Sequence, residues 1–180
     1  MGFFASKKER RILLNIREAS LKDAEGIARV HVDCWRTTYR DIISEETLKN
    51  LSYENRIKMW IQNISNETNY VFVAERDGKI IGFTDAGKEK SGKYPGYMAD
   101  ITTLYILEEY HGAGIGRQLL QHVFLKLKEN NMTSALVWVL EDNPSRHFYE
   151  AMGAKVIVYK KDITIGSKQL NLMGYGWNKI

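Results

Sequence analysis

The sequence has little cysteine and proline, one Cys and two Pro in 180 residues, and it has no long hydrophobic run. A single cysteine, Cys34, cannot form an intramolecular disulfide, and no CxxC or Cys/His cluster offers metal ligands at a useful spacing. A membrane-spanning helix would need about 20 apolar residues in succession, and a secretory signal would need an apolar run near the start. We therefore expect a cytoplasmic protein without a bound metal or a membrane span.

No Gly/Ser/Pro linker, internal repeat or low-complexity tract divides the chain after residue 12. The length of 180 residues, with 44% hydrophobic and 27% charged content, fits one ordinary globular domain. Four basic residues, Lys7, Lys8, Arg10 and Arg11, stand close together near the start. We predict a basic extension over residues 1–11 and a single domain over residues 12–180.

The net charge of +4 is compatible with nucleic acid or with a phosphorylated ligand. A nucleic-acid-binding module is the weaker of these alternatives, because no helix-turn-helix, RNP-like or zinc-finger pattern accompanies the scattered basic residues.

Hydrophobic periodicity predicts the elements of the first half of the chain. A strand is expected over 12–17, then a helix that Ser20 caps and that ends near Arg40, then a helical region over 44–64 with a break near Ser52. Trp60 and Ile61 are predicted on the buried side of that region. Two strands, 70–76 and 79–86, flank Asp77-Gly78, the pair that a tight hairpin turn prefers.

The second half alternates strands and helices. We predict a strand over 98–106, a helix over 114–130, a strand over 135–140, a short helix over 144–152 with Asn143 as cap and Pro144 first, and a closing hairpin of 155–165 with 168–177. Ile115, Leu119, Val123 and Leu127 share one face of the longer helix. This order predicts an α/β fold with a mixed sheet.

A glycine-rich segment, His111-Gly112-Ala113-Gly114-Ile115-Gly116-Arg117, stands between a predicted strand and an amphipathic helix. Glycines let successive N–H groups point at one spot, and the helix N-terminus adds partial positive charge, which together suit a pyrophosphate. Arg117 stands where a Rossmann fingerprint would need its third glycine, and the Gly-Lys-Ser/Thr of a P-loop is absent. A tight turn without a ligand remains the alternative.

At this segment the sequence resembles the GCN5-related N-acetyltransferase (GNAT) superfamily, whose acetyl-CoA loop reads Arg/Gln-x-x-Gly-x-Gly/Ala before a helix. A second family motif, Asn-x-x-Ala-x-x-x-Tyr-x-x-x-Gly-Phe, is similar to the stretch from Asn143 to Ala154. His111, Arg146 and Ala154 depart from the two patterns. The resemblance extends from Ile16 to Trp177 and implies a mostly antiparallel, splayed sheet with helices on both faces.

The resemblance implies an acetyl-CoA-dependent N-acetyltransferase that moves the acetyl group directly to a primary amine of a small molecule or a protein. Tyr149 matches the family's partner of the departing thiolate, and Asp100 is the candidate base, because relatives often carry Glu there. The implied acceptor side includes Trp35 and Tyr39. The implied cofactor-binding residues are Leu104, Tyr105, Ile106, His111, Gly112, Ala113, Gly114, Ile115, Gly116, Arg117, Asn143 and Arg146.

Two other interpretations stay open. A protein of the same fold that binds CoA without turnover would carry the same motifs, and a homodimer is compatible with the sequence. Cys34 is a conceivable nucleophile, but its place on the apolar stripe of the first helix favours a buried structural role.

Overall fold

The computed structural model describes residues 14–180, so the predicted extension over 1–11 and Ile12 lie outside the described residues. Seven strands form one sheet in the order β1-β2-β3-β4-β5-β7-β6. The strands are β1 (Leu14–Glu18), β2 (Asn69–Arg76), β3 (Lys79–Lys88), β4 (Ala99–Ile106), β5 (Ala135–Leu140), β6 (Lys155–Ile165) and β7 (Lys168–Trp177). The α-helices are α1 (Ala24–Thr38), α2 (Glu45–Lys49), α3 (Tyr53–Ser65), α4 (Ile115–Glu129) and α5 (Arg146–Ala151).

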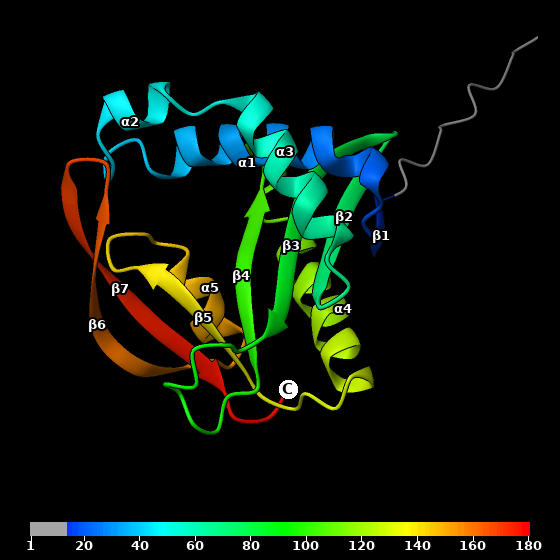
Figure 1. Ribbon diagram of the computed structural model, residues 1–180, viewed down its shortest axis with the longest axis vertical. Coiled ribbons are helices and arrows are strands. Elements are labelled where there is room, and N and C mark those ends of the chain that lie inside the picture. The colour runs from blue at the N-terminus through cyan, green and yellow to red at the C-terminus, as the bar shows by residue number, and fades with distance from the viewer. Residues whose placement is uncertain (1–13) are drawn as a thin grey trace, which may run out of the picture.

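The sheet separates two layers of helices, as predicted. Figure 1 shows α1 and α3 across one face and α4 behind the sheet. The predicted face of α4 is confirmed, because Ile115, Leu119, Val123 and Leu127 are all buried against the sheet. Between residues 14 and 180, no helix is both long enough and apolar enough to cross a bilayer.

The single parallel pairing among the described strands creates the central feature of the fold. β4 and β5 pair over three residues each, Ala99–Ile101 with Ala135–Val137, while the other neighbouring strands are antiparallel. Beyond Ile101 and Val137 the two strands diverge, which Figure 1 shows between the green and yellow strands. The residues that follow on β4 and β5 therefore border a gap in the sheet.

A second, smaller core closes one side of this gap. Tyr39, Ile43, Leu48 and Leu140 are buried together, and apolar residues of the β6–β7 hairpin pack against them. Lys168 Nζ donates to the Ile42 carbonyl at 3.1 Å, which ties the hairpin to the segment between α1 and α2. The hairpin thus reaches over the gap from the β5 side.

Three expectations about the helices were wrong in detail. The helix predicted from Pro144 begins at Arg146, because Asn143 and Pro144 form a turn in which the Arg146 N–H bonds to the Asn143 carbonyl, only three residues back. A 3₁₀ turn, Leu21–Asp23, separates Ser20 from the start of α1, whose end at Thr38 lies close to the expected end near Arg40. Ile61 is 43% exposed, although its neighbour Trp60 is fully buried.

Candidate active site

The glycine turn places left-handed backbone directly before α4. Gly112 has φ +76° and Gly114 has φ +75°, and no atom lies within 4 Å of where a Cβ would stand at either residue. Side chains rarely adopt this backbone conformation. A Cβ at Gly116 would lie 3.2 Å from the Phe148 ring, so glycine there lets α4 approach α5. The turn therefore leaves open space in front of the helix N-terminus.

The N-terminus of α4 presents free donors to that space. Its first intrahelical bond runs from the Gln118 N–H to the Gly114 carbonyl, so the N–H groups of Ile115, Gly116 and Arg117 have no carbonyl one turn back. The helix dipole adds partial positive charge at the same end. Open glycines and free N–H groups fit the pyrophosphate of coenzyme A.

His111 and Arg117 flank the turn in different ways. The His111 Nε2 donates to the Ile106 carbonyl at 2.8 Å, so this nitrogen holds the turn against the end of β4. Arg117 is exposed in the first turn of α4. Its guanidinium is the side chain that can reach a phosphate by two parallel hydrogen bonds.

The end of β4 offers its backbone to the gap. The Leu107 N–H bonds to Ile81, and residues in an antiparallel pair alternate between the two edges of a strand. The backbone groups of Leu104 and Ile106 consequently point toward the gap, and those of Tyr105 point toward β3. Of the predicted trio, Leu104 thus has both main-chain groups on the gap side, and Ile106 has its N–H there, since the Ile106 carbonyl already accepts from His111.

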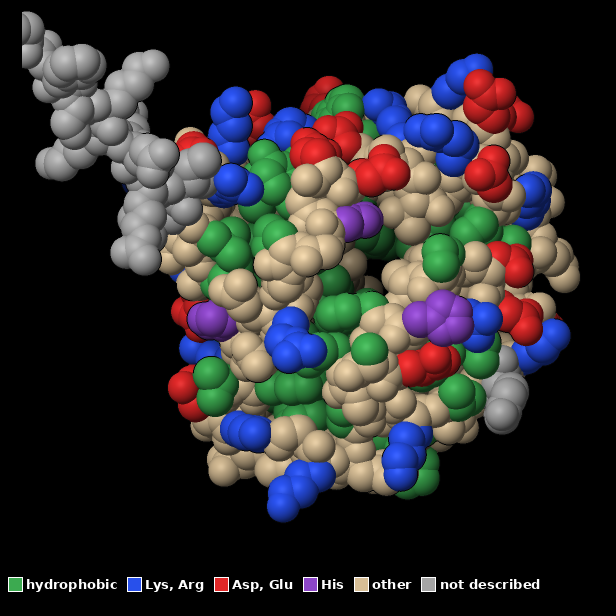
Figure 2. Space-filling view, turned by 180° about the vertical axis from the view of Figure 1, so that it is seen from behind, with side chains coloured by type: hydrophobic (Ala, Val, Ile, Leu, Met, Phe, Trp, Pro, Cys, Tyr) green, Lys and Arg blue, Asp and Glu red, His purple; other side chains and the backbone are tan. Residues whose placement is uncertain are grey.

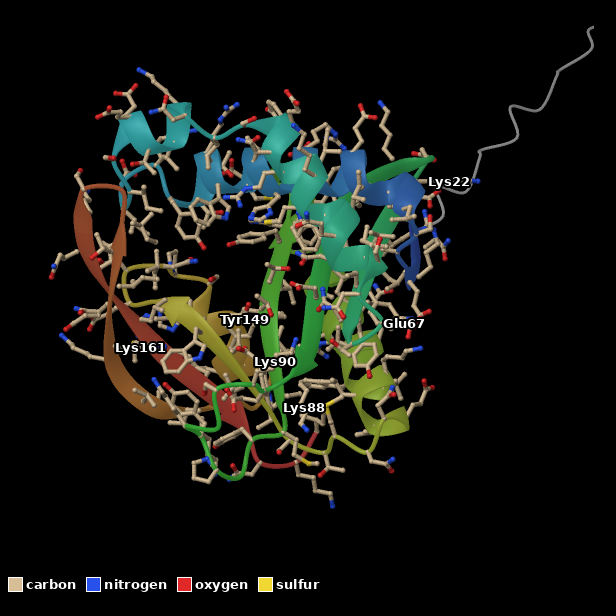
Figure 3. All side chains as sticks on the ribbon, in the orientation of Figure 1. Lys22, Glu67, Lys88, Lys90, Tyr149 and Lys161 are labelled. Atoms are coloured by element: carbon tan, nitrogen blue, oxygen red, sulfur yellow. The ribbon has the colours of Figure 1, made fainter. Side chains whose placement is uncertain are left out.

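Tyr149 enters the gap from α5. Figure 3 shows it between β4 and β5, and its side chain is buried, with 6% exposed. Burial raises the pKa of Tyr149 well above the ordinary value of a phenol. The Tyr149 hydroxyl therefore stays protonated at neutral pH and can act as a hydrogen-bond donor.

Asn143 and Arg146 support this short helix. The Asn143 side chain accepts from the Ser145 N–H at 2.9 Å, and the residue is 4% exposed. The Asn143 carbonyl accepts from the Arg146 N–H at 3.2 Å. Asn143 therefore shapes the turn that aims Tyr149, while Arg146 is half-buried at the first residue of α5 and its charge acts on Glu150 and Tyr175.

An aromatic cluster joins residues that the sequence assigned to different ligands. The Tyr105 hydroxyl accepts from Trp35 Nε1 at 3.0 Å and shares a hydrogen bond with the Tyr39 hydroxyl at 3.1 Å. Burial raises the pKa of both tyrosines, so they remain neutral. The Tyr105 side chain thus belongs with Trp35 and Tyr39 on the α1 side, and its assignment to the cofactor rests on the resemblance alone.

Asp100 lies at the base of the gap with an unsatisfied oxygen. Its Oδ1 is buried and has no hydrogen-bond partner within residues 14–180. Burial, with the charges of Glu89 and Asp85, raises the pKa of Asp100 to about 6, while Lys161 acts in the opposite direction. A carboxylate in this state is ionised at neutral pH and has a pKa near that of an effective general base.

Asp85 is the residue that sequence reasoning missed. It is 3% exposed on β3, accepts a hydrogen bond from the Thr103 hydroxyl, and burial raises its pKa to about 6. The available signal was a carboxylate inside the otherwise uncharged and mostly apolar run from Ile80 to Ala86. Two buried carboxyl groups therefore lie near the gap, where one was predicted.

Neither the lone cysteine nor the open cavity of the described residues contributes to this site. Cys34 is 2% exposed and burial raises its thiol pKa to about 12, which agrees with a structural role. Within residues 14–180, no group of three His, Cys, Asp or Glu side chains could hold a metal ion. One open cavity of about 430 Å³ is lined by Glu18, Tyr70 and Lys126 among others, and it contains none of the predicted site residues. In contrast, the hollow that Figure 2 shows near the middle of the molecule from behind coincides with the gap between β4 and β5, and α4 lies to one side of it.

Comparisons with known proteins agree with this geometry. The model of the acetyltransferase (GNAT) family matches residues 27–154. The chain is 36% identical over 166 residues to the uncharacterized N-acetyltransferase YuaI of Bacillus subtilis (strain 168), covering 92% of this chain and 93% of that protein. It is 27% identical over 149 residues to a spermidine N(1)-acetyltransferase of Thermoplasma acidophilum, covering 79% and 89% of the two chains.

Solved structures of N-acetyltransferases share this fold. A PaiA N-acetyltransferase from Thermoplasma acidophilum, in complex with coenzyme A, superposes with a TM-score of 0.71 at 25% identity and covers 92% of this chain and 100% of that chain. A Salmonella typhimurium protein with acetyl-CoA bound, yncA, has a TM-score of 0.69 at 19% identity, covering 92% and 93%.

Proposed function

The chain belongs to the acetyltransferase (GNAT) family and is an N-acetyltransferase that uses acetyl-CoA, and we propose that it transfers the acetyl group directly to a primary amine. The observation that carries the choice of acceptor is the buried, unpartnered Oδ1 of Asp100 at the base of the gap. A protonated amine is the group that such an oxygen would bind and deprotonate. The relative named as a spermidine acetyltransferase supports an amine of this kind.

We assign cofactor binding to the glycine turn and the end of β4. The N–H groups of Ile115, Gly116 and Arg117 would hold the pyrophosphate, and the edge of β4 at Leu104 and Ile106 would hold the extended arm of the cofactor. Acetyl-CoA supplies the activated acetyl group as a thioester.

Tyr149 has the role of a hydrogen-bond donor to the sulfur that leaves. Because its pKa is raised, full proton transfer from this phenol to a thiolate is more unfavourable than for an ordinary tyrosine. A neutral hydroxyl that donates a hydrogen bond stabilises developing negative charge without giving up its proton.

Asp100 has the role of the base that accepts the amine's proton. An alkylamine with a pKa near 10.4 is only about 0.1% neutral at pH 7.4, so the site must collect that proton. The raised pKa of Asp100, about 6, leaves it ionised at that pH and brings it closer to the amine's own pKa.

Asp100→Asn tests the assignment with little change in shape. We expect turnover at pH 7 to fall by about 10²-fold or more and to recover partly as the pH rises, because more of the amine is then free. The measurement is CoA thiol release with a panel of primary amines. The acetyl-CoA-induced rise in melting temperature should be kept.

Two outcomes would contradict the proposal. If none of the primary amines in the panel causes thiol release, the acceptor assignment is wrong and a CoA-binding protein without turnover is favoured. An Asp100→Asn variant with the parent's pH profile would make Asp100 structural.

A further inference from the structure

Trp138 lies where β5 leaves its partner β4. It is the residue after Val137, the last one paired with β4, and its ring is half-buried. The Tyr94 ring packs against it edge-on at 5.2 Å between centroids. The ammonium of Lys161 lies 4.8 Å from the centre of the Trp138 ring. The free face of this indole therefore already receives a primary ammonium.

Asp100 and Trp138 share one face of the sheet. Asp100 pairs with Leu136 in the parallel register, and Trp138 is two residues further along the same strand, so all three side chains point the same way. The charge of Lys161 lowers the pKa of Asp100, so the ammonium over the ring acts electrostatically on this carboxylate without forming an ion pair with it. A ring face and a carboxylate together are the usual partners of an alkylammonium ion.

Lys161 differs from its neighbours in having no ion pair. Within residues 14–180 no carboxylate lies within 4.0 Å of its Nζ, whereas Lys160 pairs with Glu141 at 3.5 Å. Figure 3 places Lys161 on β6, across β5 from Tyr149. An exposed lysine on β6 thus extends a four-carbon stem and an ammonium over the ring beside the proposed base.

We propose that Trp138 and Asp100 form the subsite for the acceptor's ammonium, and that Lys161 fills this subsite until an acceptor displaces it. The inference rests on the proposed function and names the acceptor class. That class is a primary ammonium at the end of an unbranched alkyl chain, like the lysine side chain itself. The alkyl chain of such an acceptor would pack against the apolar indole while its ammonium takes the place of the Lys161 ammonium.

The same charges disfavour another class of amine. An amine beside a carboxylate, as in a free amino acid, would bring a negative charge toward Asp100, Asp85 and Glu89. Like charges repel, and burial strengthens the repulsion. Butylamine and norvaline, which have similar carbon chains, therefore separate the two classes.

Lys161→Ala and Lys160→Ala form a matched pair for the test. Each removes one positive charge from β6, but only Lys161 lies over Trp138. We expect KM for butylamine to fall about 2- to 5-fold in Lys161→Ala, the range of an exposed cation–π contact, and to stay at the parent value in Lys160→Ala. The KM for norvaline should exceed that for butylamine in every variant.

Changes at Trp138 should act in the opposite direction. Trp138→Leu removes the ring, and KM for butylamine should rise about 5- to 30-fold with kcat less affected, because the contact is made in the ground state. Trp138→Phe keeps a ring and should recover part of the loss. Binding of butylammonium in the presence of CoA, measured by calorimetry, should follow the same order.

The outcomes separate this inference from the proposed function. If butylammonium binds with the expected dependence on Trp138 and Lys161 but no thiol is released, the subsite stands and the proposed transfer to amines is wrong. If butylamine is acetylated with the same KM in Lys161→Ala, Trp138→Leu and the parent, the subsite is wrong and the transfer stands. Absence of both binding and turnover would overturn both.

Discussion

The two sides of the gap between β4 and β5 differ in the groups that they offer to a ligand, which are mainly backbone groups on one side and side chains on the other. On the α4 side, residues 104–117 run continuously along the chain and offer mainly backbone groups. On the α1 side, Trp35, Asp85, Asp100, Trp138 and Lys161 come from five different elements and offer side chains. A site made of backbone groups tolerates a departure such as His111, which stands where the family pattern has Arg or Gln, but it depends on its glycines. A site made of side chains can change its acceptor without changing the fold.

The strongest test of the backbone side is Gly114→Val. Gly114 has φ +75°, and a bulky side chain there would strain the turn and fill the open space before α4. We expect loss of the melting-temperature rise that acetyl-CoA causes, which for a ligand at 100 times its Kd corresponds to about 2.7 kcal/mol. Differential scanning fluorimetry with and without acetyl-CoA measures it.

Gly78→Val is the matched control for this variant. Gly78 has φ +74°, also with no atom within 4 Å of its Cβ position, but it lies in the β2–β3 turn. Both substitutions should therefore lower the melting temperature of the free protein by similar amounts. If acetyl-CoA still raises the melting temperature of Gly114→Val, or no longer raises that of Gly78→Val, the glycine turn before α4 is not the part of the protein that binds the cofactor.

Tyr149→Phe tests a side chain that lies between the two sides. Removing the Tyr149 hydroxyl should leave acetyl-CoA binding intact and lower kcat by about 10²-fold, within the range for a positioned acid or base. Steady-state kinetics with a primary amine would measure the change. In Tyr53→Phe, which deletes a hydroxyl bound to Asp33 on the surface, kcat should match the parent. Parental kcat in Tyr149→Phe would leave Tyr149 as a packing residue.

The sequence predicted the two sides unequally, for a physical reason. The order of helices and strands along the chain, the Asp77-Gly78 turn and the apolar face of α4 follow from local periodicity and turn chemistry, and the structure confirms them. The buried state of Asp85 and the contact of Lys161 with Trp138 depend on strands far apart in the chain. Local sequence patterns do not show which distant strands pair. The burial of Asp85 and the contact between Lys161 and Trp138 could therefore not be predicted from the sequence.

Asp85→Asn probes the smallest expected effect, on stability and on the pH profile. Burial raises the pKa of Asp85 from 3.8 to about 6, so the folded state binds this proton more tightly than the unfolded state does. The free energy of unfolding therefore falls as pH rises from about 4 through 6. Asparagine keeps an acceptor for the Thr103 hydroxyl without the charge, so the variant should be more stable than the parent at pH 8, by up to about 3 kcal/mol, and equal to it near pH 4.

The same variant connects stability with the acceptor side. Because the Asp85 charge contributes to the raised pKa of Asp100, its removal should move the acid limb of kcat/KM to lower pH. Urea unfolding at pH 4 and pH 8 and a pH–rate profile measure the two effects, with the exposed Asp41→Asn as control. A stability gain at pH 8 without a shifted acid limb would confine Asp85 to the core. A shifted acid limb without a stability gain would mean that the Asp85 carboxyl is less buried than its place between β2 and β4 requires. If Asp85→Asn changes neither the stability nor the acid limb, Asp85 has no role on the acceptor side.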